Sequence, residues 1–344
     1  MMPITLNNVL VEHPLYVEAN SRVEDIIRRT LAGEQHLLFV NGASRVGKNY
    51  AIDEVQLRHF PKVDGDGRRE RPWLYVKIAQ TPSLSTLPRA ILIAAGMTPW
   101  AVRRSGPEPL MAAAVDAIQR LRVRVLVIDE FHHFAEKGAR AAALDAANSV
   151  KNFVDLTGVT CIMPGLPTML GLLNRDEQLR ARAQAPFHFF PYAWVVKHQR
   201  SDFAEAICSL LRRLESAGME LSLDADFVLR AYVATAGRIG IFVKLMNEAC
   251  DLARESRRIT MKTMHRAHGN AIRHDSDGPN PFADCPAEEQ AMAAFVKLLR
   301  ESGYSADFID RTLHLQGASA AAMRKVSRTQ RNAAIENMQE AFAC

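Results

Sequence analysis

The sequence predicts an α/β fold in which helices cover both faces of a parallel sheet, followed by a smaller all-helical part. Up to about residue 195, short apolar runs rich in β-branched and aromatic residues alternate with stretches of helical periodicity, and such alternation is typical of parallel sheets. Beyond that point only helical spacing continues. The 344 residues have room for both parts, because a single core usually stops growing near ~250–300 residues.

Five segments are expected to form the strands of the sheet, because each is short, apolar and bounded by polar or turn-forming residues. These strands are His36–Asn41, Trp73–Ile78, Val123–Asp129, Val159–Met163 and Phe187–Phe190. Between them, apolar residues three and four apart predict helices. The expected helices are Ser83–Ala95, Pro109–Leu121 and Ala139–Leu156.

The chain is expected to have five parts. They are an N-terminal segment (1–35), the α/β core (36–195), a helical domain (196–274), a linker (275–287) and a helical C-terminal extension (288–344). Several of the helical stretches after residue 196 open on Ser, Asp or Thr, which are preferred N-caps. The stretch HDSDGPNPFADCP collects Asp, Gly, Pro and Asn, which is the composition of a linker.

The overall composition is that of an ordinary globular protein, with 48% hydrophobic and 24% charged residues. No apolar run approaches the ~20 residues that cross a bilayer, and the N-terminus lacks a basic region followed by an apolar one, so we expect a cytoplasmic protein. The five cysteines lack metal-binding spacing and are expected to be reduced. The formal charge of +5 permits a nucleic-acid partner without requiring one.

The segment NGASRVGKNY closely matches a phosphate-binding loop. Gly42, Gly47 and Lys48 satisfy the pattern G-x-x-x-x-G-K-[ST] between an expected strand and an expected helix. In such loops the glycines let backbone N–H groups point at the phosphates, and the lysine reaches the outer phosphates. ATP contacts are therefore expected from the whole loop: Gly42, Ala43, Ser44, Arg45, Val46, Gly47, Lys48, Asn49 and Tyr50.

The run VRVLVIDEFHHF supplies the second half of the expected site. Asp129 and Glu130 follow a buried strand, and open α/β sheets bind ligands at the carboxyl ends of their strands. Asp129 is expected to hold Mg²⁺, and Glu130 to orient and deprotonate an attacking water; the alternative is a strand that ends in two solvated acids. No further metal site is predicted at His132 and His133, because adjacent helical residues face different directions and no third ligand is suitably spaced.

Asn49 departs from the loop pattern, because it occupies the place of the Ser or Thr that binds Mg²⁺. Its amide oxygen can ligate, but that oxygen lies one bond further out and the NH₂ group cannot ligate. Mg²⁺ tolerates little deviation from octahedral geometry. With Asn49 and Asp129 as the expected Mg²⁺ ligands, we therefore predict ATP binding with slow hydrolysis to ADP and phosphate.

These motifs and the sequence around them resemble the transposition ATPases of the TniB and TnsC type, a branch of the AAA+ superfamily. The resemblance is carried by VRVLVIDEFHHF, LDAANSVKNFVDLTGVTCIMPGLPTM, RDEQLRARAQ and TAGRIGIFVKLMNEACDLA, and covers roughly residues 20–273. It implies an AAA+ core with a helical lid at 196–274. It also implies an ATP-dependent regulator that forms a homo-oligomer, as a ring or filament, on double-stranded DNA and recruits a transposase. A target-selector protein is a further partner that it allows.

The resemblance also implies roles for three arginines. Arg182 or its neighbour Arg180 would reach the nucleotide of the adjacent subunit, and Arg238 would sense the γ-phosphate from the same subunit. A planar cation at either place would stabilise charge that develops on the transferred phosphoryl group. For Arg180 and Arg182, a solvated helix face is the alternative. The sensor after the fourth strand departs from the family pattern, with Thr168 as its candidate.

Sequence-neutral DNA binding requires cations that reach phosphates. The candidates, each of which is otherwise an ordinary surface charge, are Lys77, Arg103, Arg104, Lys137, Arg140 and Lys151. The basic C-terminal stretch AAMRKVSRTQRNAAIENM could contact DNA, dock a partner protein or pack on the lid. Two other functions stay open: a nucleotide-dependent DNA-binding adaptor with negligible ATP hydrolysis, and a helicase-loader ATPase of the DnaC and IstB type.

Overall fold

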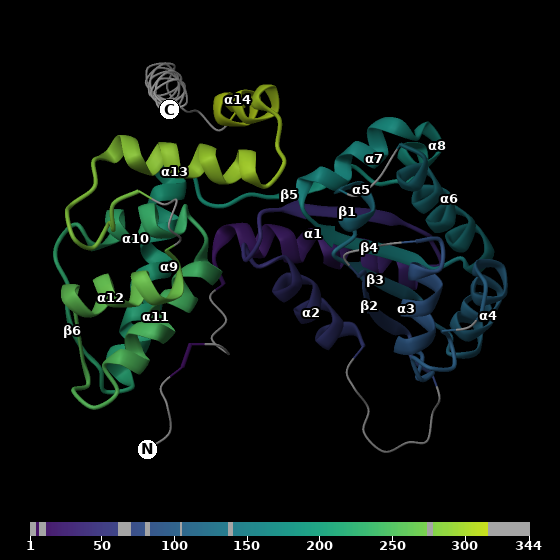
Figure 1. Cartoon of the computed structure of the whole chain (residues 1–344), viewed down its shortest axis with the longest axis horizontal. Coiled ribbons are helices and arrows are strands. Elements are labelled where there is room, and N and C mark those ends of the chain that lie inside the picture. The colour runs from purple at the N-terminus through teal and green to yellow at the C-terminus, as the bar shows by residue number, and fades with distance from the viewer. Residues whose placement is uncertain are drawn as a thin grey trace, which may run out of the picture. The chain divides into compact units, whose positions relative to one another are not determined.

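The computed structural model describes residues 5–6, 12–60, 70–79, 83–103, 105–136, 140–273 and 278–315. The chain divides into two compact units. One unit, the core, comprises Leu15–Phe190, and the other, the helical unit, comprises Met1–Pro14 and Pro191–Cys344. Figure 1 shows the elements of both units.

A five-stranded parallel sheet lies at the centre of the core, as the sequence predicts. Its strands are β1 (Leu37–Gly42), β2 (Trp73–Lys77), β3 (Val125–Asp129), β4 (Thr160–Gly165) and β5 (Phe187–Phe189), in the order β2-β3-β4-β1-β5. Each strand lies within a residue or two of its predicted position. Because all the pairs are parallel, the carboxyl ends of β1 and β3 lie at the same edge of the sheet. One strand, β4, lies between them.

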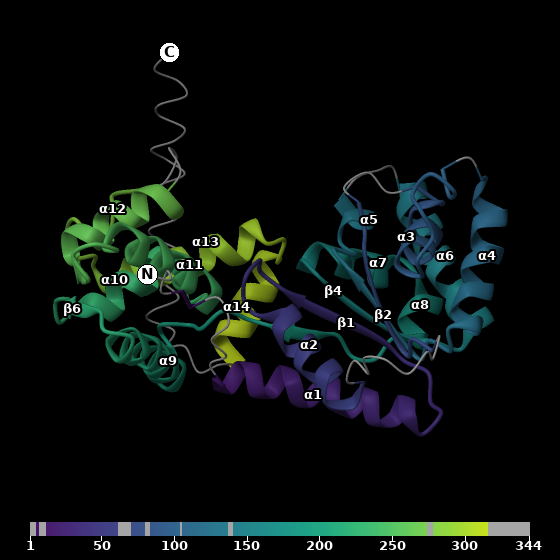
Figure 2. The ribbon, with the colours of Figure 1, turned by 90° about the horizontal axis from the view of Figure 1, so that it is seen from below.

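The alternation of side chains along the strands divides the core into two layers. In β1, Leu38 and Val40 face one layer and Leu37 and Phe39 face the other, because successive side chains of a strand point to opposite faces. The first layer contains α1 (Pro14–Leu31) and α2 (Lys48–His59). The second contains α3 (Thr86–Ala94), α4 (Pro107–Arg120), α6 (Arg140–Thr157), α7 (Leu170–Arg175) and α8 (Glu177–Arg182). Figure 2 shows α1 and α2 on one side of the sheet and α3, α4 and α6 on the other.

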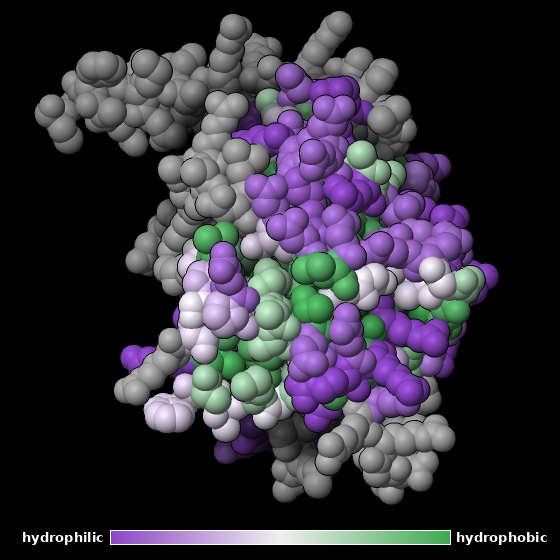
Figure 3. Space-filling model, turned by 90° about the vertical axis from the view of Figure 1, so that its right-hand side faces the viewer, coloured by the Kyte–Doolittle hydropathy of each residue, from purple (hydrophilic) through white to green (hydrophobic). Residues whose placement is uncertain are grey.

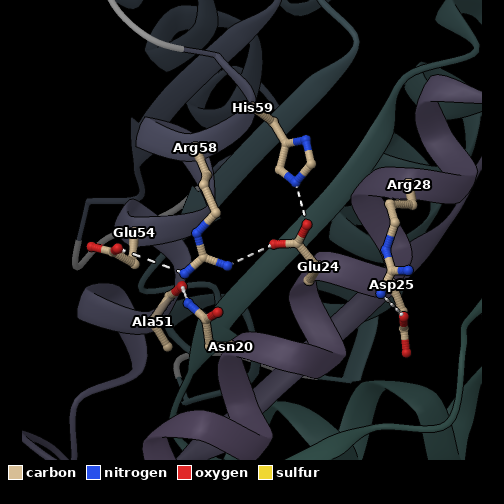
Figure 4. A network of polar contacts seen from close by, with 8 residues as sticks. All are labelled: Asn20, Glu24, Asp25, Arg28, Ala51, Glu54, Arg58 and His59. Carbon is tan, nitrogen blue, oxygen red and sulfur yellow. Dashed lines mark hydrogen bonds and ion pairs between the residues drawn. The ribbon is translucent and has the colours of Figure 1, made fainter. Parts of the chain in front are cut away.

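Polar contacts hold α2 against α1 (Figure 4). The buried Asn20 donates its side-chain amide to the backbone oxygen of Ala51, at 3.2 Å. Glu24 of α1 accepts from Arg58 at 3.1 Å and contacts His59 at the other end of α2. Two places along α2 are therefore anchored, which fixes the direction of the helix that follows the loop.

The surface of the core is largely hydrophilic on the side shown in Figure 3, with a smaller apolar area among the polar residues. In the part of the chain that the structure describes, none of the helices combines the length and the apolarity needed to cross a bilayer.

The helical unit contains six helices within the described residues. They are α9 (Lys197–Ser216), α10 (Phe227–Thr235), α11 (Ile239–Leu252), α12 (Met261–Ala271), α13 (Glu288–Glu301) and α14 (Ala306–Leu315). The sequence analysis missed a small parallel pair, β6 (Glu220–Ser222) and β7 (Arg258–Thr260). Each of these strands has only three residues, which is too short for a periodic pattern to be recognised.

His13 and Tyr192 meet inside the helical unit. The Tyr192 hydroxyl lies 2.7 Å from His13 Nδ1, and burial lowers the pKa of His13 from its ordinary 6.5 to about 4. The imidazole of His13 therefore binds a proton less readily in the folded chain than in the unfolded chain. Below pH 6.5 protonation favours the unfolded state, and the loss of stability is complete once the pH falls below about 4.

We expect His13→Gln to reduce the acid sensitivity of the fold. Between pH 7 and pH 4.5, urea unfolding should show a loss of stability in the wild type that is smaller in the variant by up to about 3 kcal/mol, because glutamine has no proton to take up. The exposed His198 is the control, and His198→Gln should follow the wild type. An identical pH dependence in wild type and His13→Gln would contradict this assignment.

Candidate nucleotide-binding site

The loop between β1 and α2 depends on its two glycines for different reasons. Gly47, which immediately precedes α2, has a φ of 112°, a left-handed conformation that side chains other than glycine rarely adopt. Gly42 has no room for a side chain, because a Cβ there would lie 2.4 Å from the backbone oxygen of Phe189 in β5. The Gly-x-x-x-x-Gly spacing therefore matches one conformational need and one close approach of two backbones.

The loop presents backbone and side-chain groups at the N-terminus of α2, whose first N–H groups lack partners within the helix. Ala43 and Val46 are buried and hold the loop against the core. Exposed positions alternate with them: Ser44, Arg45, Asn49 and Tyr50. An anion at this helix N-terminus would meet both unpaired amides and the positive end of the helix dipole.

Lys48 folds back onto the loop that precedes it. Its ammonium group donates to the backbone oxygens of Gly42, at 2.7 Å, and Ala43, at 2.8 Å. Burial lowers the pKa of Lys48 to about 8, while the charges of Asp129 and Glu130 act in the opposite direction. Two carbonyl oxygens stabilise an ammonium group less than phosphate oxygens would, so a bound phosphate could displace them.

Asp129 forms the centre of the polar contacts at this edge of the sheet. Its Oδ1 accepts the backbone N–H of Glu130 at 2.8 Å. Its Oδ2 accepts the side-chain amide of Asn49 at 3.0 Å and also the Tyr75 hydroxyl. The carboxylate of a buried strand end is thus surrounded by donors from α2, β2 and its own backbone.

Tyr75 and Asp53 belong to this site although the sequence analysis did not select them. Burial and the contact with Asp129 raise the pKa of Tyr75, so its hydroxyl keeps the proton that it donates. Burial and the charge of Asp129 raise the pKa of Asp53, which lies one turn after Asn49 on α2. A sequence signal existed for both: Tyr75 shares a strand face with Lys77, and Asp53 shares a helix face with Asn49.

The two expected Mg²⁺ ligands, Asn49 and Asp129, contact each other directly, and an ion between them would require the Asn49 amide to turn its oxygen inward. A carboxylate only accepts hydrogen bonds, so the amide of Asn49 must turn its NH₂ group, which cannot ligate a metal, toward Asp129. Tyr75 and the Glu130 amide occupy further acceptor positions of the same carboxylate. The side chains that would supply metal ligands are therefore bonded to each other.

Glu130 has a left-handed backbone, with a φ of 57°, and its carboxylate contacts other side chains than that of Asp129 does. Its Oε2 lies 3.3 Å from His132 Nδ1, and its Oε1 lies 3.9 Å from the ammonium group of Lys77. Lys77, expected among the DNA contacts, thus ends β2 beside the acidic pair. The two neighbouring acids face different partners.

The structure overturns the expectation that His132 and His133 face apart. His132 lies in the turn that precedes α5 (His133–Glu136), and the two ring centroids are 4.3 Å apart. Glu130 is a third candidate ligand that spacing alone did not reveal, since single potential ligand atoms of Glu130, His132 and His133 all lie within 4.8 Å of one another. The helical rule failed here because the segment is a turn.

The predicted arginine positions lie on the surface or at a helix start. Arg180 and Arg182 are exposed on α8, where Arg182 pairs with Asp155 at 3.0 Å. Arg238 immediately precedes α11 in the helical unit and donates to the backbone oxygen of Thr235 at 2.9 Å. Thr168 lies in the short 3₁₀ turn directly after β4, the place expected of a sensor.

The remaining DNA candidates fall into three groups. Arg103 is exposed. Arg104, Lys137 and the side chain of Arg140 lie outside the described residues, as does the basic C-terminal stretch. Lys151 is buried, and its ammonium group pairs with Asp176 at 2.9 Å and donates to Gln178 at 3.2 Å. Lys151 therefore joins α6 to the start of α8, and its charge is not displayed on the surface.

A comparison with protein families identifies the chain. The family model described as bacterial TniB protein matches residues 5–192, which is more than half of the sequence and includes the whole sheet. The chain belongs to the TniB family. No curated protein matches it in sequence.

Solved structures confirm the fold of this TniB-family chain. Cdc6p of Pyrobaculum aerophilum superposes with a TM-score of 0.58 at 13% identity, over 92% of this chain and 91% of that one. ORC2 of Aeropyrum pernix, described in ADPNP and ADP complexes, gives 0.53 at 14% identity, over 78% and 71%. ORC1 of the same organism, described in complex with DNA, gives 0.53 at 17% identity, over 77% and 66%. The predicted fold class, a parallel sheet with helices on both faces followed by a helical part, is thereby confirmed.

We expect Gly42→Ala to destabilise the core, because the added Cβ would collide with the backbone of β5. Overpacking of this kind typically costs about 1–3 kcal/mol, which thermal unfolding can detect. Gly171→Ala is the matched control, because a Cβ at Gly171 meets nothing within 4 Å. A Gly42→Ala variant that unfolds at the wild-type temperature would contradict the close approach of the loop to β5.

Proposed function

We propose that this TniB-family chain is an ATP-binding regulator of DNA transposition. ATP would bind in the loop between β1 and α2, and the bound form would assemble as a homo-oligomer on double-stranded DNA and recruit a transposase. The observation that supports ATP binding most directly is the position of Lys48, whose ammonium group is held inside the loop beside Asp129 and Glu130.

Binding would proceed by exchange of contacts within the loop. The phosphate oxygens would accept hydrogen bonds from the backbone N–H groups at the start of α2. They would also draw the Lys48 ammonium away from the oxygens of Gly42 and Ala43. The left-handed residues Arg45 and Gly47 support this, because they orient successive amides around the turn. The neutral form of Lys48 becomes less favourable as the phosphates arrive.

Hydrolysis would be slow for two reasons. Glu130, the proposed base for the attacking water, already faces His132 and Lys77. Asp129 is engaged by Asn49 and Tyr75, so it is not free to organise other groups around the phosphates. Nucleotide state would then persist long enough to act as a switch between assembled and released forms.

Assembly, DNA binding and transposase recruitment are proposed from the family. The exposed position of Arg180 suits a residue that reaches the nucleotide of a neighbouring subunit, whereas Arg182 would first have to leave Asp155. Arg238 is proposed as the lid sensor, and the exposed Arg103 as a DNA contact. The DNA complex described for the ORC1 neighbour suits a DNA partner for this fold. We place the protein in the cytoplasm, where a DNA target is accessible.

A second candidate function, a nucleotide-dependent adaptor with negligible hydrolysis, is favoured by the contacts of Asp129. If Asn49 and Tyr75 never release that carboxylate, ATP would be bound and retained without turnover. A partner protein would then have to release the assembly.

We expect the purified chain to retain ATP in equilibrium dialysis, and Lys48→Ala to weaken retention roughly tenfold to a hundredfold, because a hydrogen bond from a charged group is worth about 1.5–3 kcal/mol. Lys297→Ala, on the exposed face of α13, is the control and should bind as the wild type does. Failure of the wild type to retain ATP, or equal retention by Lys48→Ala, would refute the proposed site.

We expect Asn49→Thr to raise the rate of phosphate release from ATP with DNA present. Threonine restores the residue type of the loop pattern and removes the amide that faces Asp129. Asn49→Ala separates these effects, because it removes the amide and adds no hydroxyl, so it should stay slow. Brisk hydrolysis by the wild type that Asn49→Thr does not change would show that Asn49 does not limit turnover.

A further inference from the structure

The turn after β3 is held in one conformation by its own backbone. His133 donates its N–H to the oxygen of Glu130 at 3.0 Å, Phe134 to Phe131 at 3.1 Å, and Ala135 to His132 at 2.8 Å. These three successive bonds wind the chain tightly directly after the strand ends at Asp129. Successive side chains of a strand point to opposite faces, whereas in this tight turn the side chains of neighbouring residues lie closer together.

Two phenylalanines of this turn anchor it in the core. Phe131 and Phe134 are buried, with ring centroids 5.3 Å apart, and Phe131 also contacts Phe39 of β1 at 5.9 Å. His132 is buried as well, whereas Glu130 and His133 are half-buried. The turn is therefore fixed by packing before any ligand arrives, which lowers the cost of binding one.

The three polar side chains form a ligand set. Their candidate ligand atoms lie within 4.8 Å of one another, and His132 Nδ1 and Glu130 Oε2 are 3.3 Å apart. Tetrahedral zinc with ligands at ~2.0–2.2 Å requires ligand atoms about 3.4 Å apart, so this pair already has the necessary spacing. His133 offers the third candidate ligand atom, within 4.8 Å of the other two.

We propose that Glu130, His132 and His133 bind a transition-metal dication, with Zn²⁺ as the best match. Two imidazoles and one carboxylate suit Zn²⁺ and Co²⁺, whereas Mg²⁺ prefers oxygen ligands. Three protein ligands leave a fourth position for water. A positive charge close to the cluster is that of Lys77, 3.9 Å from Glu130 Oε1; its side chain is 66% exposed, so it can turn to solvent as the dication enters.

A metal at this place would remove Glu130 from the nucleotide site. Glu130 would then be unable to orient an attacking water, while the loop and Lys48 would keep their contacts with the phosphates. The metal would therefore inhibit hydrolysis without displacing ATP. This consequence rests on the proposed function, whereas metal binding itself does not.

The test is a Co²⁺ titration of the full-length, tag-free, metal-free protein, followed by the visible absorption of the bound ion. We expect saturation at one ion per chain and displacement by Zn²⁺. His133→Ala should weaken binding about tenfold or more, by loss of a direct ligand. His59→Ala is the matched control, because His59 also lies beside a carboxylate, that of Glu24, but belongs to no group of three potential ligands among the described residues; it should bind as the wild type does.

A second variant distinguishes loss of the site from misfolding, and distinguishes the proposed ligands from the native cysteines. His133→Cys should keep the site and add a near-ultraviolet thiolate-to-cobalt absorption that the wild type lacks. The proposal is overturned by failure to bind one Co²⁺, by His133→Ala binding as tightly as the wild type, by equal weakening in His59→Ala, or by a thiolate band in the wild type.

A final arm measures phosphate release and ATP retention with and without Zn²⁺. We expect Zn²⁺ to reduce phosphate release in the wild type but not in His133→Ala, with ATP retention unchanged in both. Loss of ATP retention on addition of Zn²⁺ would overturn the inhibitory role. If the chain retains no ATP under any condition, the proposed function fails, and the Co²⁺ titration still decides the metal site.

Discussion

The polar contacts at the candidate site depend on how many hydrogen bonds one buried carboxylate, that of Asp129, can accept. Asp129 ends β3 and accepts hydrogen bonds from Asn49 of α2, from Tyr75 of β2 and from the backbone of Glu130. Three segments that are far apart in the sequence therefore meet at two oxygen atoms. Because an unpaired buried charge is costly, these donors and the carboxylate constrain one another, and the loop is tied to the edge of the sheet through Asn49.

The same contacts give the two adjacent acids different surroundings. Asp129 is held among donors inside the site, while the left-handed backbone of Glu130 turns its carboxylate toward His132 and Lys77. One acid thus holds three segments together, while the other lies beside His132 and Lys77. An asparagine in the loop strengthens the structural role, because an amide donates to Asp129 with a group that cannot serve as a metal ligand.

Much of the core could be predicted because its causes are local in the sequence. A strand buried on both faces must be apolar along its length, so β1, β3 and β4 were visible as uninterrupted runs. Gly42, Gly47 and Lys48 follow a spacing that only a tight turn between a strand and a helix requires. Asp129 and Glu130 were selected because residues at the carboxyl end of a parallel strand face the ligand crevice.

What the sequence by itself determined was the α/β core, the glycine-bounded loop between β1 and α2, and the acidic pair, since each is encoded in a short continuous stretch. Only the tertiary structure decided which side chains meet there. Tyr75 reaches Asp129 because β2 pairs with β3, Lys151 is buried because α6 packs against α8, and His132 approaches His133 because a turn replaces the expected helix. These contacts depend on distances between segments that are remote along the chain or on a change of backbone conformation, and neither leaves a periodic signal.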